Sequence, residues 1–97
     1  MPTHEEYLQF LREYRALTQT QRRAFLKAMR HMVDDLQAKR PFRSSLHVKG
    51  VQGHTGVFEM TWADDGRATF EYGPEQIPGE THIIWRRIGG HEIFKNP

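Results

Sequence analysis

The second half of the chain holds a glutamate, several arginines and a histidine that could act together on an RNA phosphodiester. They are Glu59, Arg67, Arg86, Arg87 and His91. Cleavage by the neighbouring 2′-hydroxyl needs a base that takes the hydroxyl proton and an acid that protonates the departing oxygen. A guanidinium stabilises the negative charge that builds on the phosphate between these steps. Histidine side chains suit either proton role, so His91 is a candidate for one of them.

Strand periodicity predicts that Glu59 and Arg67 share one face of a sheet. Residues 57–62 alternate apolar and polar side chains, and residues 67–72 do so again after the turn signal Asp64–Gly66. If the apolar set faces the helices, the pleat of the strands turns the polar set to the opposite, open face.

The last strand must bring a guanidinium and an imidazole to that open face. Arg86 and Arg87 are consecutive, so one points outward and the other points toward the helices or an edge. His91 follows the break at Gly89–Gly90, so its ring can swing back over the end of the sheet. The nuclease hypothesis depends on Arg87 and His91 meeting at one phosphate, and an Arg87 held beneath the helices would contradict it.

A basic stripe on the second predicted helix is a candidate for contacts with nucleic-acid phosphates. Arg23, Lys27 and Arg30 recur at spacings of four and three, which places them on one side of a helix. Residues 1–45 carry nine Lys and Arg against five Asp and Glu, although the net charge of the whole chain is only +2. This asymmetry favours a polyanionic partner.

Composition excludes several other classes of protein. A chain of 97 residues predicts a single domain, residues 1–97. It has no cysteine, which excludes disulfides, thiolate zinc sites and a cysteine nucleophile. The six histidines show no metal-ligand spacing, so we expect no metal and no other cofactor. No segment approaches the roughly 18 apolar residues of a membrane span, and the polar N-terminus is unlike a leader, so we expect a cytoplasmic protein.

The pattern of the whole chain predicts an α+β fold. Thr3 is the expected N-cap of a first helix that runs to Leu17, and Thr18 begins a second helix that ends before Pro41. The short connection between them predicts an antiparallel helix hairpin. Period-two patterns then predict a small antiparallel sheet that packs on the hairpin. Its expected strands are residues 46–48, 57–62, 67–72 and 81–88.

The order of these elements and four local phrases resembles the RelE/ParE superfamily of bacterial toxins from type II toxin–antitoxin pairs. The phrases are Leu46–Gly53, Gly56–Met60, Gly66–Tyr72 and Trp85–Phe94. The resemblance implies a helix hairpin on a twisted antiparallel sheet whose concave face carries the activity. It further implies cleavage of messenger RNA, usually on the ribosome, and a cognate antitoxin that silences the toxin in a hetero-oligomer; a homodimer is also open.

Individual residues match positions of the family. Arg87 matches the arginine before the terminal glycine turn, His91 matches a histidine used for proton transfer, and Phe94 matches a common aromatic position. Lys49 matches a basic position on the first strand. Arg67 lies at the start of the strand that usually supplies an active-site arginine.

The chain also departs from the family pattern at two positions. Thr61 and Thr69 stand where members of the family carry arginines. The resemblance therefore leaves Arg86, Lys49 or His54 to supply the missing positive charge at the RNA.

Three functions stay open at this point. The first is a metal-independent endoribonuclease toxin that cleaves messenger RNA. The second is a ParE-like inhibitor that binds DNA gyrase and cuts nothing, which the incomplete arginine set favours and His91 disfavours. The third is an inactive member kept as an antitoxin-binding or RNA-binding module.

Overall fold

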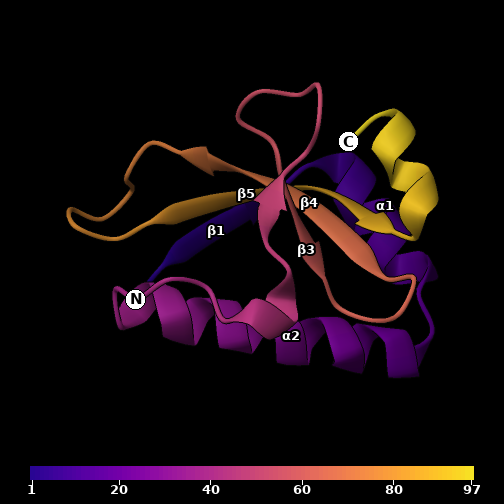
Figure 1. The fold of residues 1–97 in the computed structure, drawn as a ribbon, viewed down its shortest axis with the longest axis horizontal. Helices are drawn as coiled ribbons and strands as arrows, with labels where there is room; N and C mark the ends of the chain where they lie inside the picture. The colour runs from indigo at the N-terminus through magenta and orange to yellow at the C-terminus, as the bar shows by residue number, and fades with distance from the viewer.

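Two helices lie against a five-stranded mixed sheet in the computed structural model, which describes residues 1–97 (Figure 1). The elements, with the two short 3₁₀ helices labelled η, are β1 (Thr3–Glu6), α1 (Leu8–Ala16), α2 (Gln19–Gln37), η1 (Ser44–Leu46), β2 (Lys49–Gly50), β3 (Phe58–Thr61), β4 (Arg67–Gly73), β5 (His82–Gly89) and η2 (His91–Lys95). The strand order is β1-β5-β4-β3-β2, and only the β1–β5 pair is parallel. The predicted α+β arrangement of a helix pair on a small sheet is confirmed.

The start of the chain differs from the prediction, because Thr3 begins a strand and not a helix. β1 pairs with β5 in parallel register from Thr3 opposite His82 to Glu6 opposite Trp85. The buried His82 ring holds the strand, with Nδ1 2.8 Å from Thr3 Oγ1 and Nε2 2.9 Å from Glu5 Oε1. Pairing with the sheet therefore overrides the local capping signal, and the expectation of a purely antiparallel sheet was wrong at this edge.

The second helix begins as predicted. Thr18 accepts a hydrogen bond from the backbone N–H of Gln21, and the Gln21 side chain accepts one from the Thr18 N–H. This reciprocal capping satisfies two backbone donors at the helix start. α1 ends at Ala16, one residue before the predicted Leu17, and its Phe10 and Tyr14 rings pack on Phe25 of α2. Neither helix has the length and apolar character needed to cross a lipid bilayer.

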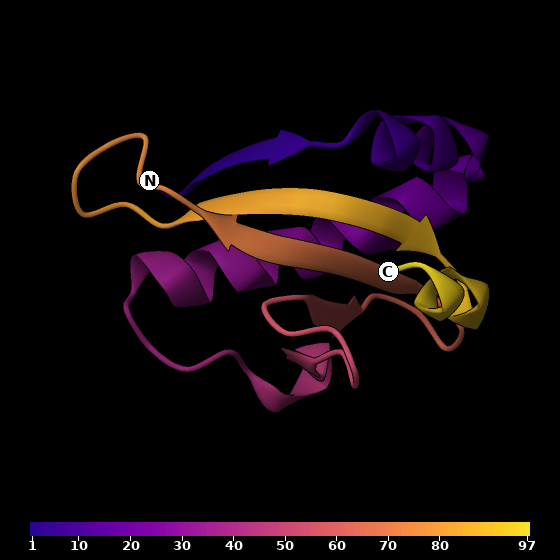
Figure 2. The same cartoon turned by 90° about the horizontal axis from the view of Figure 1, so that it is seen from above.

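One hydrophobic cluster joins both helices to one face of the sheet. Its eleven buried residues are Phe10, Phe25, Ala28, Met32, Leu46, Met60, Ala68, Phe70, Ile83, Trp85 and Ile88. Met60 and Phe70 are completely buried, which confirms that the apolar set of β3 and β4 faces the helices. Figure 2 looks onto the other face of the sheet, with α2 crossing behind the strands.

A buried carboxylate fixes the segment that follows α2. Asp35 is 1% exposed and accepts hydrogen bonds from Arg40 Nε at 2.7 Å, and from Arg43 Nη2 at 2.9 Å. It also accepts from Arg43 Nε at 3.0 Å and from the Arg43 backbone N–H at 2.9 Å. The Arg43 hydrogen bonds hold the pKa of Asp35 far below its usual range. This cluster sets where the chain enters η1 and β2, and thereby where Lys49 lies.

The first strand of the predicted antiparallel sheet is shorter and later than expected. Residues 44–46 form η1, and His47 adopts a left-handed conformation with φ of 48°. Only Lys49 and Gly50 pair with β3. The left-handed residue interrupts the extended backbone that residues 46–48 would have needed.

Candidate functional site

A groove of about 810 Å³ runs from α2 and η1, past β3, to η2. Most of the predicted site residues line it, namely Lys27, Lys49, Glu59, Arg67, His91 and Phe94. β2 covers only the Phe58–Glu59 part of β3, so the other half of this strand is left open to the groove. The groove therefore follows from the shortness of β2.

Strand pairing places Glu59 beside a lysine. Glu59 stands directly opposite Lys49 on β2 and opposite Thr69 on β4. Side chains opposite each other on neighbouring strands project to the same face, with Cβ atoms about 5 Å apart. Glu59 and Lys49 are consequently neighbours at the middle of the groove.

Arg67 is held at the rim of the groove by the β3–β4 turn. Its Nη1 donates to the carbonyl oxygens of Ala63 at 3.1 Å, Asp64 at 3.2 Å and Gly66 at 2.9 Å. All of these bonds use one nitrogen atom, so Nε and Nη2 can donate to a ligand in the groove. The turn itself requires glycine, because a Cβ on Gly66 would lie 2.6 Å from the Trp62 ring.

The His91 ring is oriented by Asp65 from the same turn. Nδ1 of His91 forms a hydrogen bond with Asp65 Oδ1, and the His91 ring lies edge-on to Phe94 with centroids 5.8 Å apart. This hydrogen bond lowers the pKa of the Asp65 carboxyl. Because Nδ1 is engaged, Nε2 is the ring atom available for proton transfer. Gly90 makes the approach possible, since a Cβ there would overlap Asp65 Oδ2.

Arg87 does not line the groove in which His91 lies. The β4–β5 pairing places Arg87 opposite Thr69 and Trp85 opposite Phe70, so Arg86 is the extra residue of a bulge. Arg87 turns toward α1 and donates to Glu13 through Nε at 2.9 Å and Nη2 at 2.8 Å. These hydrogen bonds raise the pKa of Arg87. Arg87 is therefore held by an ion pair with Glu13, and its meeting with His91 at one phosphate stays a prediction.

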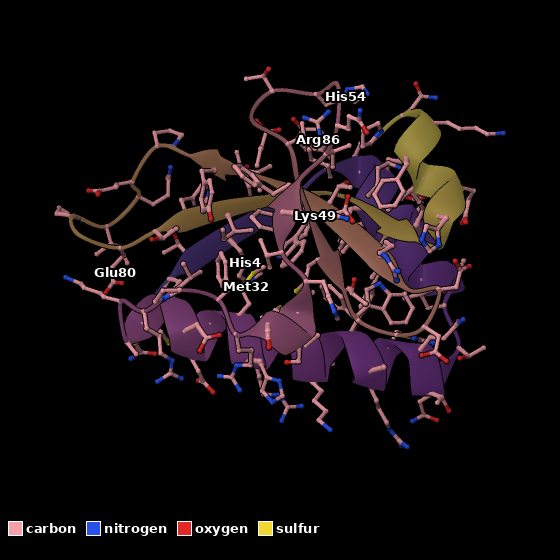
Figure 3. All side chains as sticks on the ribbon, viewed as in Figure 1. His4, Met32, Lys49, His54, Glu80 and Arg86 are labelled. Atoms are coloured by element: carbon pink, nitrogen blue, oxygen red, sulfur yellow. The ribbon has the colours of Figure 1, made fainter.

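Arg86 is the arginine on the open face, where Figure 3 shows its side chain above the sheet. Its Nη1 donates to Glu71 Oε1 at 2.7 Å, and its guanidinium lies 5.2 Å from the centre of the Tyr7 ring. Tyr7 also donates to Glu71. The sequence predicted that one arginine points outward and the other toward the helices or an edge; Arg86 contacts Glu71 on the open face, and Arg87 contacts Glu13 of α1.

Comparison with known proteins gives a fold but no close relative. No protein-family profile matches the chain, and no curated protein matches it. A YoeB/ParE toxin from Agrobacterium tumefaciens superposes with a TM-score of 0.65 at 10% identity, over 92% of this chain and 98% of that one. YafQ from E. coli gives 0.62 at 12% identity, over 95% and 96%. The RelB–RelE complex of Methanococcus jannaschii gives 0.58 at 15% identity, over 94% of both chains.

The chain has the fold of the RelE-like toxins. The resemblance stated from the sequence is thereby confirmed at the level of fold. At these identities the superpositions establish the arrangement of helices and strands, and the chemistry rests on the residues in the groove.

Several predicted RNA-binding residues lie outside the groove of this RelE-like fold. Arg23 and Arg30 are exposed on α2, where only Lys27 of the basic stripe reaches the groove. His54 lies in the loop that rises from the sheet between β2 and β3 (Figure 3). Arg86 lies on the open face beside the groove, as described above.

The structure adds three residues that sequence reasoning did not place in the site. Asp65 contacts His91, and His31 and His47 line the groove beside Lys27. The sequence indicates for Asp65 only a place in the turn Asp64–Gly66. The antiparallel pairing of the last two strands could have indicated that Asp65 lies near His91, because it brings that turn to the same end of the sheet. No group of three or more His, Asp or Glu side chains is arranged to hold a metal ion.

Proposed function

We propose that this protein is the toxin of a type II toxin–antitoxin pair and cleaves messenger RNA without a metal, with residues 1–97 as the acting domain. The observation that carries the proposal is the hydrogen-bonded His91–Asp65 pair, whose imidazole lines a groove with Glu59, three cations and the Phe94 ring. Such a set supplies the acid, the base and the charge stabilisation that phosphodiester cleavage needs.

Each residue takes a role suited to its position. Glu59 accepts the proton of the 2′-hydroxyl as its oxygen attacks the neighbouring phosphorus. His91, in its protonated form, donates its Nε2 proton to the departing 5′-oxygen, while Asp65 fixes Nδ1. The products are a 2′,3′-cyclic phosphate and a 5′-hydroxyl, and no oxidant or water is consumed. Lys49 and the two unengaged nitrogens of Arg67 stabilise the developing charge on the phosphate oxygens.

Phe94 supplies an apolar surface beside the imidazole. An aromatic ring next to a cleavage site binds a nucleobase by stacking, which is tolerant of base identity. The ring of Phe94 is partly exposed and lines the groove. We therefore assign it to the base next to the scissile phosphate.

The partners follow from the same proposal. Solved complexes of fold neighbours, DinJ–YafQ and RelB–RelE, pair a toxin with an antitoxin, which supports an antitoxin partner and a toxin–antitoxin hetero-oligomer here. The exposed Arg23 and Arg30 beside Lys27 favour contacts with ribosomal RNA phosphates. Action on translating ribosomes places the protein in the cytoplasm.

Inducible expression with mapping of messenger RNA 5′ ends tests the proposal. The wild-type chain should arrest growth and produce new 5′ ends inside translated regions. His91→Ala should lose at least about 100-fold in cleavage, the usual scale for an acid–base group. Lys49→Ala should also lose cleavage, because its charge no longer stabilises the phosphate oxygens. Arg12→Ala, an exposed cation on α1 away from the groove, is the matched control and should behave as wild type. Undiminished cleavage by His91→Ala would contradict the proposal.

A second candidate function is binding without cleavage of RNA. The protein would then act either as a gyrase inhibitor or as an inactive module. The observation in its favour is that Arg86 and Arg87 are both held by carboxylates of the protein itself. A DNA-damage response with intact messenger RNA indicates gyrase inhibition. Normal growth of a host that lacks any antitoxin indicates an inactive module.

A further inference from the structure

The groove has a second end, at α2 and η1, which the proposed cleavage reaction does not use. Lys27, His31 and His47 line the groove there, and we refer to these three residues as the α2–η1 cluster. The part of the lining that comes from α2, η1 and His47 contains no carboxylate, whereas Glu59 and Asp64 line the part along β3 and its turn. Hydrogen-bond donors and positive charge without negative charge suit a phosphate.

Helical spacing and the Asp35 cluster position these side chains. Lys27 and His31 are four residues apart on α2, so their side chains are neighbours on one face of the helix. Arg43 joins the start of η1 to this helix, because its Nη2 donates to the His31 carbonyl oxygen at 3.3 Å and its Nε donates to Asp35 at 3.0 Å. His47 is the C-cap of η1. The cluster therefore comes from two elements that are fastened to each other.

The side chains of the α2–η1 cluster are available to a ligand. Lys27 and His47 are exposed and His31 is half-buried. No hydrogen bond or ion pair within the protein engages these three side chains, in contrast to the guanidinium groups of Arg86 and Arg87. A neutral imidazole offers one N–H donor, a protonated imidazole offers two, and an ammonium group offers three. Several donors can thus converge on one phosphate.

The order of groups along the groove sets the direction of an RNA strand in the proposed reaction. Glu59 stands opposite Lys49, which follows the α2–η1 cluster by two residues, whereas His91 contacts Asp65 of the β3–β4 turn. Glu59 accepts the proton of the attacking 2′-hydroxyl, and His91 protonates the 5′-oxygen of the next nucleotide. The nucleotide that carries the attacking hydroxyl therefore extends toward the α2–η1 cluster, and its own 5′-phosphate points there.

The groove has room for this longer ligand. Its volume of about 810 Å³ lies in the upper part of the range of about 300–1,000 Å³ for pockets that hold drug-sized ligands. Ala24 and Ala28 line the wall beside Lys27, and their short side chains leave space next to its ammonium group. A dinucleotide with a terminal phosphate is a ligand of this size.

We propose that the α2–η1 cluster binds the phosphate on the 5′ side of the nucleotide whose 2′-hydroxyl attacks. The protein then engages two consecutive phosphates of single-stranded RNA. This proposal rests on the proposed function, because the direction of the strand follows from the roles of Glu59 and His91. The second phosphate contact holds the strand in one register, with the scissile phosphate between the acid and the base.

Three dinucleotides that cannot be cut test the proposal on the wild-type protein. Each is ApA with 2′-O-methyl groups on both nucleosides, and carries a 5′-phosphate, a 3′-phosphate or no terminal phosphate. Titrations followed in ¹H–¹⁵N NMR spectra give Kd and locate each ligand. The 5′-phosphate should tighten binding about tenfold and shift the amide resonances of the α2–η1 cluster. The 3′-phosphate adds the same charge at the other end and should tighten binding less than about twofold, because salt screens distant charges.

Two variants assign the gain in affinity to the cluster. His31→Ala with His47→Asn removes both imidazoles, and it preserves the local backbone because alanine favours helices and asparagine tolerates a left-handed conformation. Lys27→Ala removes the ammonium group. In each variant the gain from the 5′-phosphate should fall from about tenfold to about threefold or less. Arg12→Ala removes one exposed positive charge on α1, outside the groove, and should keep the full gain.

A 5′-phosphate that gives no gain on the wild-type protein, or a larger gain from the 3′-phosphate, would overturn the proposal. So would a full gain that survives in both cluster variants. These results would leave the proposed cleavage standing. Undiminished cleavage by His91→Ala would instead contradict the proposed function without changing the dinucleotide affinities. Absence of binding by all three dinucleotides would overturn both proposals.

Discussion

The buried Asp35 cluster gives the most quantitative prediction, the effect of Asp35→Asn on stability. The substitution preserves the shape of the side chain but removes its charge and replaces one acceptor oxygen by a donor. Asp35 accepts four hydrogen bonds, all from Arg40 and Arg43, and its side chain is 1% exposed. The amide NH₂ of asparagine would face donors of Arg40 and Arg43, of which only Arg43 Nη2 has another acceptor, the His31 carbonyl oxygen at 3.3 Å.

The expected cost is about 3 kcal/mol. Breaking a buried ion pair by removing one partner typically costs about 3–5 kcal/mol. The lower end applies because the Arg40 side chain is 54% exposed, so its guanidinium regains contact with water. A loss of about 3 kcal/mol lowers the melting temperature of a domain of this size by about 12–24 °C. That loss is a large part of the roughly 5–15 kcal/mol of a typical domain.

The assay is urea unfolding followed by circular dichroism, with Asp34→Asn as the matched control. Asp34 is the exposed neighbour on the same helix, and its substitution should change the free energy of unfolding by less than about 0.5 kcal/mol. A similar result for Asp35→Asn would refute the reasoning, because it would mean that the cluster contributes no net stability.

The dependence on pH has a definite sign. Hydrogen bonds from Arg43 lower the folded-state pKa of Asp35 below the unfolded value of about 3.9. The contribution of Asp35 is therefore complete above about pH 4 and is lost as the pH falls toward the folded pKa. The difference in stability between wild type and Asp35→Asn should shrink steadily below about pH 4.

Three further variants test other parts of the fold. Met32→Ala, at a 1% exposed core position, should cost about 2–5 kcal/mol in urea unfolding, whereas Lys39→Ala at an exposed site should cost almost nothing. His82→Ala removes both side-chain anchors of β1, so amide hydrogen exchange of residues 3–6 should accelerate while β4 stays protected. Gly66→Ala places a methyl group against the Trp62 ring and should cost about 1–3 kcal/mol by thermal melting.

Local patterns predicted the elements with strong periodicity. The capping box at Thr18 and the alternation around Met60 and Phe70 were correct, because in each case the local preference and the global fold agree. Thr3 failed since its capping signal competed with a strand partner that lies 79 positions away, at His82. The residues around Thr3 do not by themselves indicate a partner so far along the chain.

The sequence predicted several of the residues that line the groove, but not how all of the candidate side chains are oriented. Glu59, Arg67 and His91 follow from alternation and from the glycine break, and all three line the groove. The contact of Arg87 with Glu13 of α1 was not predictable, because a bulge interrupts the alternation within β5. In the sequence, that bulge is indicated by the spacing of Trp85 and Ile88, which are three positions apart and are both buried.

The parallel pairing of β1 with β5 also governs when the molecule can be completed during synthesis. The helix hairpin lies early in the chain, so it can form while the ribosome is still extending the polypeptide. β1 finds its partner only after residues 82–85 have emerged, and the imidazole of His91 follows later still. Pairs so distant in sequence form late, because closing a long loop is entropically costly. A nascent chain interrupted before this point would hold neither a closed sheet nor a complete groove.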